Sequence, residues 1–361
     1  MCALQTSTVM APMAIDLDSL VPLPAFSTHC GMGAGLAVCP ILRLIAAYDA
    51  KDSTLSIFAL PDTATALASL IRVGGGDARS GATGGLAVVH KTAPSWGMFS
   101  PSYGHGALAF TGPESARRLL VADHRAVHVM RMPSVAHGGY VAAPGTLARP
   151  QGVAARGTLV AVSVWDSYQA GDHAVHLFEG DWATGTWSPV RILAGGFGRP
   201  GHAAGQLSSP RGLRLSADGS TVAVVEAGNH RVSLFRVEDG SLVRQAATGP
   251  GPRDVEVCEG GWMVACYEED AVEYLGVGDD GGATGRGRLG GSGVDKVLST
   301  PVAVAVVPGL GLLVREYTTN RLQLFADRDA VAMASMSAHR VGWMVAVVLA
   351  ALQRNQRHPA S

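Results

Sequence analysis

Arg211, Arg253 and Gln151 are the residues whose type and spacing best suit a binding site. Each directly follows a proline, and each opens a short apolar segment. Guanidinium groups bind carboxylates through charge-assisted, often paired, hydrogen bonds. We therefore expect a binding site with the two arginines as its charged centre and Gln151 beside them. The expected partner is a protein or peptide of acidic character.

A long connecting segment, 74–103, supplies a further candidate. It contains Trp96, and aromatic side chains commonly anchor interfaces together with arginine. His105 lies just after this segment, close to the start of an apolar strand, and joins the candidate binding residues. A lone imidazole makes no zinc site. We expect no catalytic residue, no metal ion and no cofactor.

These residues belong to a repeat. A motif of the form hydrophobic-x-hydrophobic-Phe, clearest as VSLF at 232–235, recurs along the chain. Its copies lie at 55–58, 127–130, 175–178, 232–235, 272–275 and 322–325. A turn, often of Pro-x-Gly type, opens a strand upstream of each copy, at 35–38, 106–110, 150–154, 210–213, 252–255 and 301–304. One such unit cannot bury its apolar face alone, so six must stack into a repeat structure.

Each unit contains four predicted strands. The spacing from Gly35 to Phe58 equals that from Gly212 to Phe235, and it leaves room for three short strands with tight turns. The second strand ends in an acidic residue in four units: Asp49, Asp123, Glu226 and Glu316. A less regular fourth strand follows, for example at 239–244. The sequence therefore predicts an all-β fold, a six-bladed antiparallel β-propeller, with Phe235 buried between adjacent sheets.

One unit resembles a known family. The letters SPRGL at 209–213 and EAGNHRVSLF at 226–235 are similar to an NHL repeat, and the 301–325 unit is the next closest. The resemblance covers roughly 28–336 and implies a six-bladed, TolB-like propeller. It also implies a non-enzymatic scaffold that binds a protein partner through one face.

The resemblance leaves two alternatives open. NHL propellers often follow a RING domain, and this chain has no cysteine and histidine array for one, so it would be a substrate-recruiting module in a ubiquitin ligase assembly. A metal-dependent hydrolase or lactonase would hold a divalent cation with acids from several inner strands, and here Asp254 and Glu256 come from one. A related zinc lyase would need histidines after the opening prolines, where Gln151, Arg211, Arg253 and Val302 stand.

Strand order predicts where binding occurs. In a four-stranded antiparallel unit, the start of the first strand, the turn after the second strand and the connector to the next unit share one face. We call it the loop-bearing face, because the connectors 74–103, 194–209 and 276–300 lie there. Binding residues concentrate on loops that a rigid scaffold positions.

Some polar residues of the repeat have structural roles in this interpretation. Arg231 and Arg321 lie in equivalent turns, where we expect each to tie its turn to neighbouring carbonyls. His128 and His176 occupy equivalent places in third strands. We expect both to be packed between sheets or half-exposed rather than to be ligands.

Composition limits the remaining possibilities. The net charge of −1 gives no basic surface of the kind that nucleic-acid binding needs, so we expect no nucleic-acid partner. The first 20 residues lack the pattern of a secretory signal, which predicts a cytoplasmic protein, and we expect a monomer. We divide the chain into an N-terminal extension at 1–27, the propeller at 28–336 and an apolar and basic tail at 337–361, expected to be helical. The apolar run 341–352 is shorter than the about 20 residues of a transmembrane helix.

Overall fold

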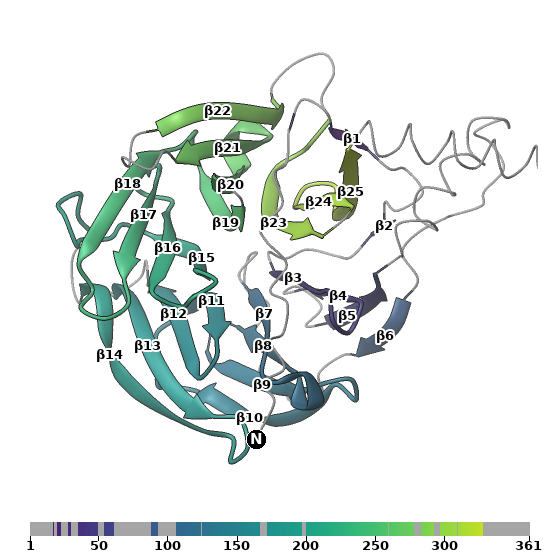
Figure 1. Ribbon diagram of the computed structural model, residues 1–361, viewed down its shortest axis with the longest axis vertical. Helices are drawn as coiled ribbons and strands as arrows, with labels where there is room; N and C mark the ends of the chain where they lie inside the picture. The colour runs from purple at the N-terminus through teal and green to yellow at the C-terminus, as the bar shows by residue number, and fades with distance from the viewer. Residues whose placement is uncertain are drawn as a thin grey trace, which may run out of the picture.

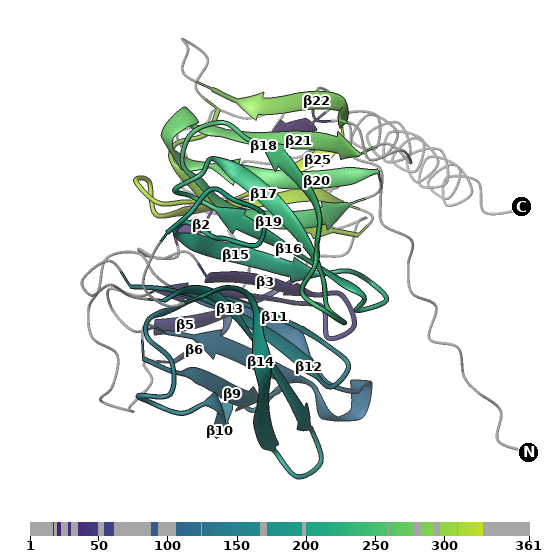
Figure 2. The same cartoon turned by 90° about the vertical axis from the view of Figure 1, so that its left-hand side faces the viewer.

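The chain forms a six-bladed antiparallel β-propeller, as predicted, with six sheets arranged around a central axis (Figure 1). This computed structural model describes residues 17, 20–22, 28–29, 35–49, 54–60, 88–92, 106–123, 125–166, 172–196, 200–258, 260–277, 283–291, 297–308 and 310–327. Trp96, His105 and the tail at 337–361 lie outside these residues. Figure 2 turns the ring so that its outer strands β14 and β18 face the viewer.

Each blade runs outward from an inner strand. Blade 1 contains β3 (Gly35–Cys39), β4 (Leu44–Asp49), β5 (Thr54–Ala59) and β6 (Val88–Thr92). Blade 2 contains β7 (Ala107–Thr111), the 3₁₀ turn η3 (Glu114–Ala116), β8 (Arg118–Ala122), β9 (Val127–Arg131) and β10 (Ala136–Ala142). Blade 3 contains β11 (Pro150–Arg156), β12 (Leu159–Trp165), β13 (His173–Asp181) and β14 (Thr186–Gly196).

The remaining blades follow the same plan. Blade 4 contains β15 (Pro210–Leu215), β16 (Thr221–Glu226), β17 (Arg231–Arg236) and β18 (Leu242–Ala247). Blade 5 contains β19 (Pro252–Cys258), β20 (Gly261–Cys266), the 3₁₀ turn η4 (Tyr267–Glu269), β21 (Ala271–Val277) and β22 (Ala283–Gly290). Blade 6 contains β23 (Pro301–Val307), β24 (Gly311–Glu316) and β25 (Arg321–Asp327), completed by β1 (Leu20–Pro22) and β2 (Thr28–His29).

The two ends of the propeller meet in blade 6. Strands β1 and β2 both pair antiparallel with β25, so the outer strand of the last blade comes from the start of the chain. Part of the expected N-terminal extension therefore belongs to a blade. The buried Arg315 of β24 also donates to the carbonyl oxygens of Gly35 and Tyr48 in blade 1, the latter at 2.7 Å. Both features join the last blade to residues near the start of the chain.

The hydrophobic core lies between neighbouring blades. Phe235 is fully buried and packs in a cluster with Val175 and Leu177 of blade 3 and Leu213 of its own blade, as predicted. The last residue of every motif copy is buried against the preceding blade in the same way: Phe58, Met130, Phe178, Phe235, Leu275 and Phe325. The six copies thus mark six equivalent blade interfaces.

Buried polar groups fix the turns after the second strands. Glu226 has no exposed surface and accepts hydrogen bonds from Arg231 at 2.7 Å and from Ser233. Arg231 also donates to the carbonyl oxygens of His202 and Gln206, which confirms its predicted role. Arg321 instead pairs with the buried Glu316, at 2.9 Å.

The two third-strand histidines lie as predicted. His128 is fully buried, 3.3 Å from the Asp123 carboxylate, and His176 is partly buried, 3.8 Å from Asp172. None of the helical turns in the part of the chain that the structure describes has the length and apolar character of a membrane-spanning helix.

Candidate binding site at the loop-bearing face

The residues that follow the opening prolines do not pair with the neighbouring strand. In each of blades 3 to 6 the pairing between the first two strands shifts register directly after the proline, which leaves one or two residues unpaired. Such irregularities redirect side chains and are common beside binding sites. The residues placed in this way are Gln151, Arg211, Arg253 and Val302.

The residue before each opening proline has a left-handed backbone. Its φ is 47° at Arg149, 49° at Ser209, 65° at Gly251 and 47° at Thr300. This conformation is unfavourable for a residue with a Cβ, so surrounding contacts must hold it. The same turn therefore starts four inner strands.

Hydrogen bonds from the preceding blade hold these turns. The backbone N–H of Ser209 donates to Nδ1 of His173 at 2.8 Å, and that of Gly251 donates to Nδ1 of His230 at 3.2 Å. The backbone N–H of Thr300 donates to Oδ1 of Asp270 at 2.6 Å. His173, His230 and Asp270 occupy the same repeat position, two residues before the third-strand motif. We call this contact the inter-blade hydrogen bond.

Glycine allows neighbouring inner strands to approach one another. A Cβ on Gly152 would overlap the carbonyl oxygen of Arg211, and a Cβ on Gly212 would overlap Asp254. The Pro-x-Gly pattern is therefore a requirement of close packing at the opening of blades 3 and 4. It brings the opening residues of adjacent blades together.

Arg211 bridges blades 3 and 4. Its guanidinium lies over the ring of Trp165, 4.6 Å from the ring centre, and its Nη1 donates to Oε1 of Gln151 at 3.3 Å. Gln151 is buried, and its Nε2 donates to the carbonyl oxygen of Arg149 at 3.1 Å. Both Arg211 and Trp165 remain partly exposed.

Arg253 makes a similar arrangement in the next blade. Its guanidinium lies over the ring of Tyr267, again 4.6 Å from the ring centre. The ring of Tyr267 meets that of Tyr317 edge to face, with centres 6.0 Å apart. Stacking on an aromatic face suits guanidinium because it leaves the in-plane N–H groups able to donate to an anion.

The two arginines form a region of positive potential. Burial, together with the neighbouring charge of Arg253, lowers the pKa of Arg211 to about 9. Burial also lowers the pKa of Arg253, while Tyr267 and the exposed Glu268 oppose this shift. Because arginine stays protonated in proteins, both shifts describe cations whose charge is poorly stabilised. A bound anion would stabilise them.

The structure thus brings together three of the five residues that the sequence proposed for binding. Gln151, Arg211 and Arg253 lie at the openings of three successive inner strands, whereas Trp96 and His105 lie outside the described residues. The sequence reasoning missed the aromatic partners Trp165 and Tyr267. Each directly follows the second-strand residue that pairs with the opening proline. Knowledge of the pairing register between the first two strands would therefore have identified both.

A second group of charged residues lies deeper along the same inner strands. Arg214 lies 3.2 Å from a carboxylate oxygen of Glu256 and 3.3 Å from one of Asp254. Burial raises the pKa of Asp254 and Glu256, and Arg214 opposes that shift. Among the described residues, no group of three or more His, Cys, Asp or Glu side chains could hold a metal ion.

Comparisons with known proteins bear on the fold alone. No protein-family model and no curated protein matches this sequence. A chain in the crystal structure of a nidogen/laminin complex is similar at 13% identity, with a TM-score of 0.47, over 70% of this chain and 78% of that one. A functionally unknown protein from Desulfotomaculum acetoxidans is similar at 12% identity, with a TM-score of 0.48, over 80% of both chains. The Cps50 (Swd1) β-propeller domain from Myceliophteria thermophila is similar at 9% identity, with a TM-score of 0.49, over 83% of this chain and 98% of that one.

Proposed function

We propose that this propeller is a non-enzymatic interaction scaffold of the NHL type that binds an acidic peptide segment at its loop-bearing face. The observation that carries the proposal is the pair of arginines at the openings of adjacent blades, each stacked on an aromatic ring. We call the group Gln151, Arg211, Arg253, Trp165 and Tyr267 the arginine mouth.

The chemistry of the arginine mouth supports an anionic ligand. Burial lowers the pKa of both guanidinium groups, and the charge of Arg253 also lowers the pKa of Arg211. The aromatic rings hold the guanidinium planes, so less conformational entropy is lost when a ligand binds. A carboxylate-rich peptide would relieve the repulsion and gain charge-assisted hydrogen bonds.

The test compares two capped, labelled tetrapeptides, one of glutamate and one of glutamine, by fluorescence anisotropy with the full chain. We expect the glutamate peptide to bind at least about tenfold more tightly, and its affinity to fall with added salt, because charge pairs near the surface are screened. The double variant Arg211→Glu, Arg253→Glu should lose this binding while its melting temperature stays within a few degrees.

The matched control is Arg236→Glu, which reverses an exposed arginine at the far end of β17 in blade 4. It should bind the glutamate peptide as the parent chain does. Equal affinity for the two peptides would refute an anion-binding mouth. Unfolding of the double variant would show that the arginine pair is structural, and the proposed function would then fail.

A further inference from the structure

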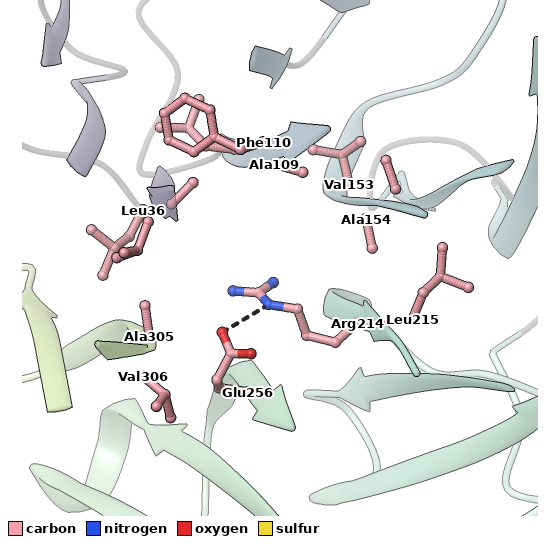
Figure 3. Close-up of a pocket in the computed structure, with 14 residues that line it drawn as sticks. Leu36, Ala109, Phe110, Val153, Ala154, Arg214, Leu215, Glu256, Ala305 and Val306 are labelled. Carbon is pink, nitrogen blue, oxygen red and sulfur yellow. Dashed lines mark hydrogen bonds and ion pairs between the residues drawn. The ribbon is translucent and has the colours of Figure 1, made fainter. Parts of the chain in front are cut away.

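The central channel has one charged wall. Arg214 and Glu256 take the same position in their blades, four residues after the opening proline, and they meet across the boundary between β15 and β19. Figure 3 shows the Arg214 guanidinium reaching into the channel with the Glu256 carboxylate against it. In blades 3 and 6 the equivalent residues are Ala154 and Ala305.

The opposite wall is apolar. All six inner strands line a cavity of about 210 Å³ around Arg214 and Glu256, and Leu36 and Phe110 lie across it from the charged pair, whereas Val306 lies beside Glu256 (Figure 3). Water occupies about 30 Å³ per molecule in the liquid, so the cavity corresponds to roughly seven waters or a ligand of about seven heavy atoms. Its lining, with one charged pair and apolar residues opposite, suits a small molecule with one charged end and an apolar body.

The charge of the wall is negative. Arg214 supplies one positive charge, whereas Asp254 and Glu256 supply two carboxylates. Asp254 is nine-tenths buried, and its Oδ2 accepts hydrogen bonds from Arg214 and from the backbone N–H of Val304, the latter at 3.2 Å. Glu256 uses one oxygen, Oε2, for Arg214 and keeps 23% of its side chain exposed in the channel. Burial raises the pKa of Glu256, and a second cation beside it would oppose this.

We propose that the central channel binds a small organic amine, with its ammonium group on the Glu256 carboxylate and its apolar body against Leu36 and Phe110. An ammonium group donates three hydrogen bonds and would neutralise the surplus negative charge. The apolar body gains from leaving water. This site lies deeper than the arginine mouth, and its ligand does not depend on the proposed function there.

The experiment uses n-butylamine as the probe and the full chain at neutral pH, with binding followed by saturation-transfer NMR. The neutral analogue n-butanol and the anion n-butyrate have bodies of similar size. We expect butylamine to bind at least tenfold more tightly than either analogue, and ammonium chloride to compete with it weakly.

Two variants locate the site. Glu256→Gln keeps the shape of the side chain and removes its charge, so butylamine binding should fall at least tenfold. Val306→Phe places a larger side chain in the cavity beside Glu256 without changing any charge, and it should also abolish binding. This variant decides the matter if Glu256→Gln does not fold. Glu238→Gln, an exposed change in blade 4, should bind as the parent chain does.

Three results would overturn the proposal. Tighter binding of butyrate than of butylamine would mean that Arg214 selects an anion. Equal competition by ammonium chloride would mean that the apolar wall contributes nothing. Unchanged butylamine binding in Val306→Phe would place the amine elsewhere.

Discussion

Blades 4 and 6 start with the same backbone and present different side chains to the channel. Ser209 and Thr300 have φ values of 49° and 47°, and each precedes a proline at which the strand pairing shifts. Glu226 and Glu316 end their second strands, and both are fully buried. Yet two positions that hold arginine in blade 4, 211 and 214, hold valine and alanine in blade 6.

The comparison separates the residues that build the blade from those that can bind. The opening turn, the inter-blade hydrogen bond and the buried acid recur where the inner strand carries no charge. The binding chemistry then depends on which residues a blade has at a few positions. These are the positions that do not pair with the neighbouring strand and the positions that face the channel. In blades 4 and 5 these substitutions are adjacent, which places the arginine mouth and the charged channel wall on one side of the axis.

The largest expected effect comes from a residue that builds the blade. Phe235→Ala leaves a cavity between blades 3 and 4 and should lower the free energy of unfolding by about 3–5 kcal/mol. Urea unfolding followed by tryptophan fluorescence measures the change. The control Val243→Ala, at a side chain that is 44% exposed, should change stability by no more than about 0.5 kcal/mol. Similar losses in both variants would contradict a core located between the blades.

The sequence was sufficient for the interior of each blade because its signals are local. The buried motif residues recur in all six units and the opening prolines in four, and both lie where the repeat predicts. The closure of blade 6 was not predictable in this way. Strand β1 has three residues and no repeat landmark, and its place depends on the free edge of β25, a partner distant in the sequence.

The binding residues were predictable in part for a related reason. Arg211 and Arg253 could be placed on adjacent blades because both follow a landmark proline. Their aromatic partners directly follow the landmark position of the second strand. That position holds an acidic residue in four blades, whereas blades 3 and 5 have Val164 and Cys266 there. Without the acid, the repeats could not be aligned there. The partner of Glu256 was missed because a contact between blades requires the register of both.

A smaller effect should appear as a dependence of stability on pH. Burial lowers the pKa of His173, although Asp172 and Asp166 oppose the shift, and its Nδ1 accepts a hydrogen bond from Ser209. The unfolded chain then binds more protons than the folded one once the pH falls below the usual histidine pKa of about 6.5. The contribution of His173 to the free energy of unfolding is therefore fully present above that value, and it decreases as the pH falls toward the pKa of His173 in the folded chain.

Urea unfolding of the parent chain and of His173→Asn, from about pH 8 to about pH 5, tests this dependence. Asparagine keeps an acceptor and does not titrate, so the variant should lose less stability on acidification. His202→Asn, at an exposed histidine, should keep the parent slope. An unchanged slope in His173→Asn would show that this histidine does not contribute to the dependence.

The smallest effect distinguishes two substitutions at one repeat position. His230 has a φ of 49° and accepts the inter-blade hydrogen bond of Gly251, while the equivalent residues of blades 5 and 6 are Asp270 and Asn320, with φ values of 55° and 53°. Asparagine tolerates this backbone better than other residues with a Cβ, and its side-chain oxygen can accept the bond. His230→Asn should therefore match the parent chain in stability. His230→Ala should lose about 1 kcal/mol, because the bond is lost and the backbone stays strained. Urea unfolding of the two variants side by side decides the matter, since equal stability would mean that the turn before Pro252 holds its shape without its neighbour.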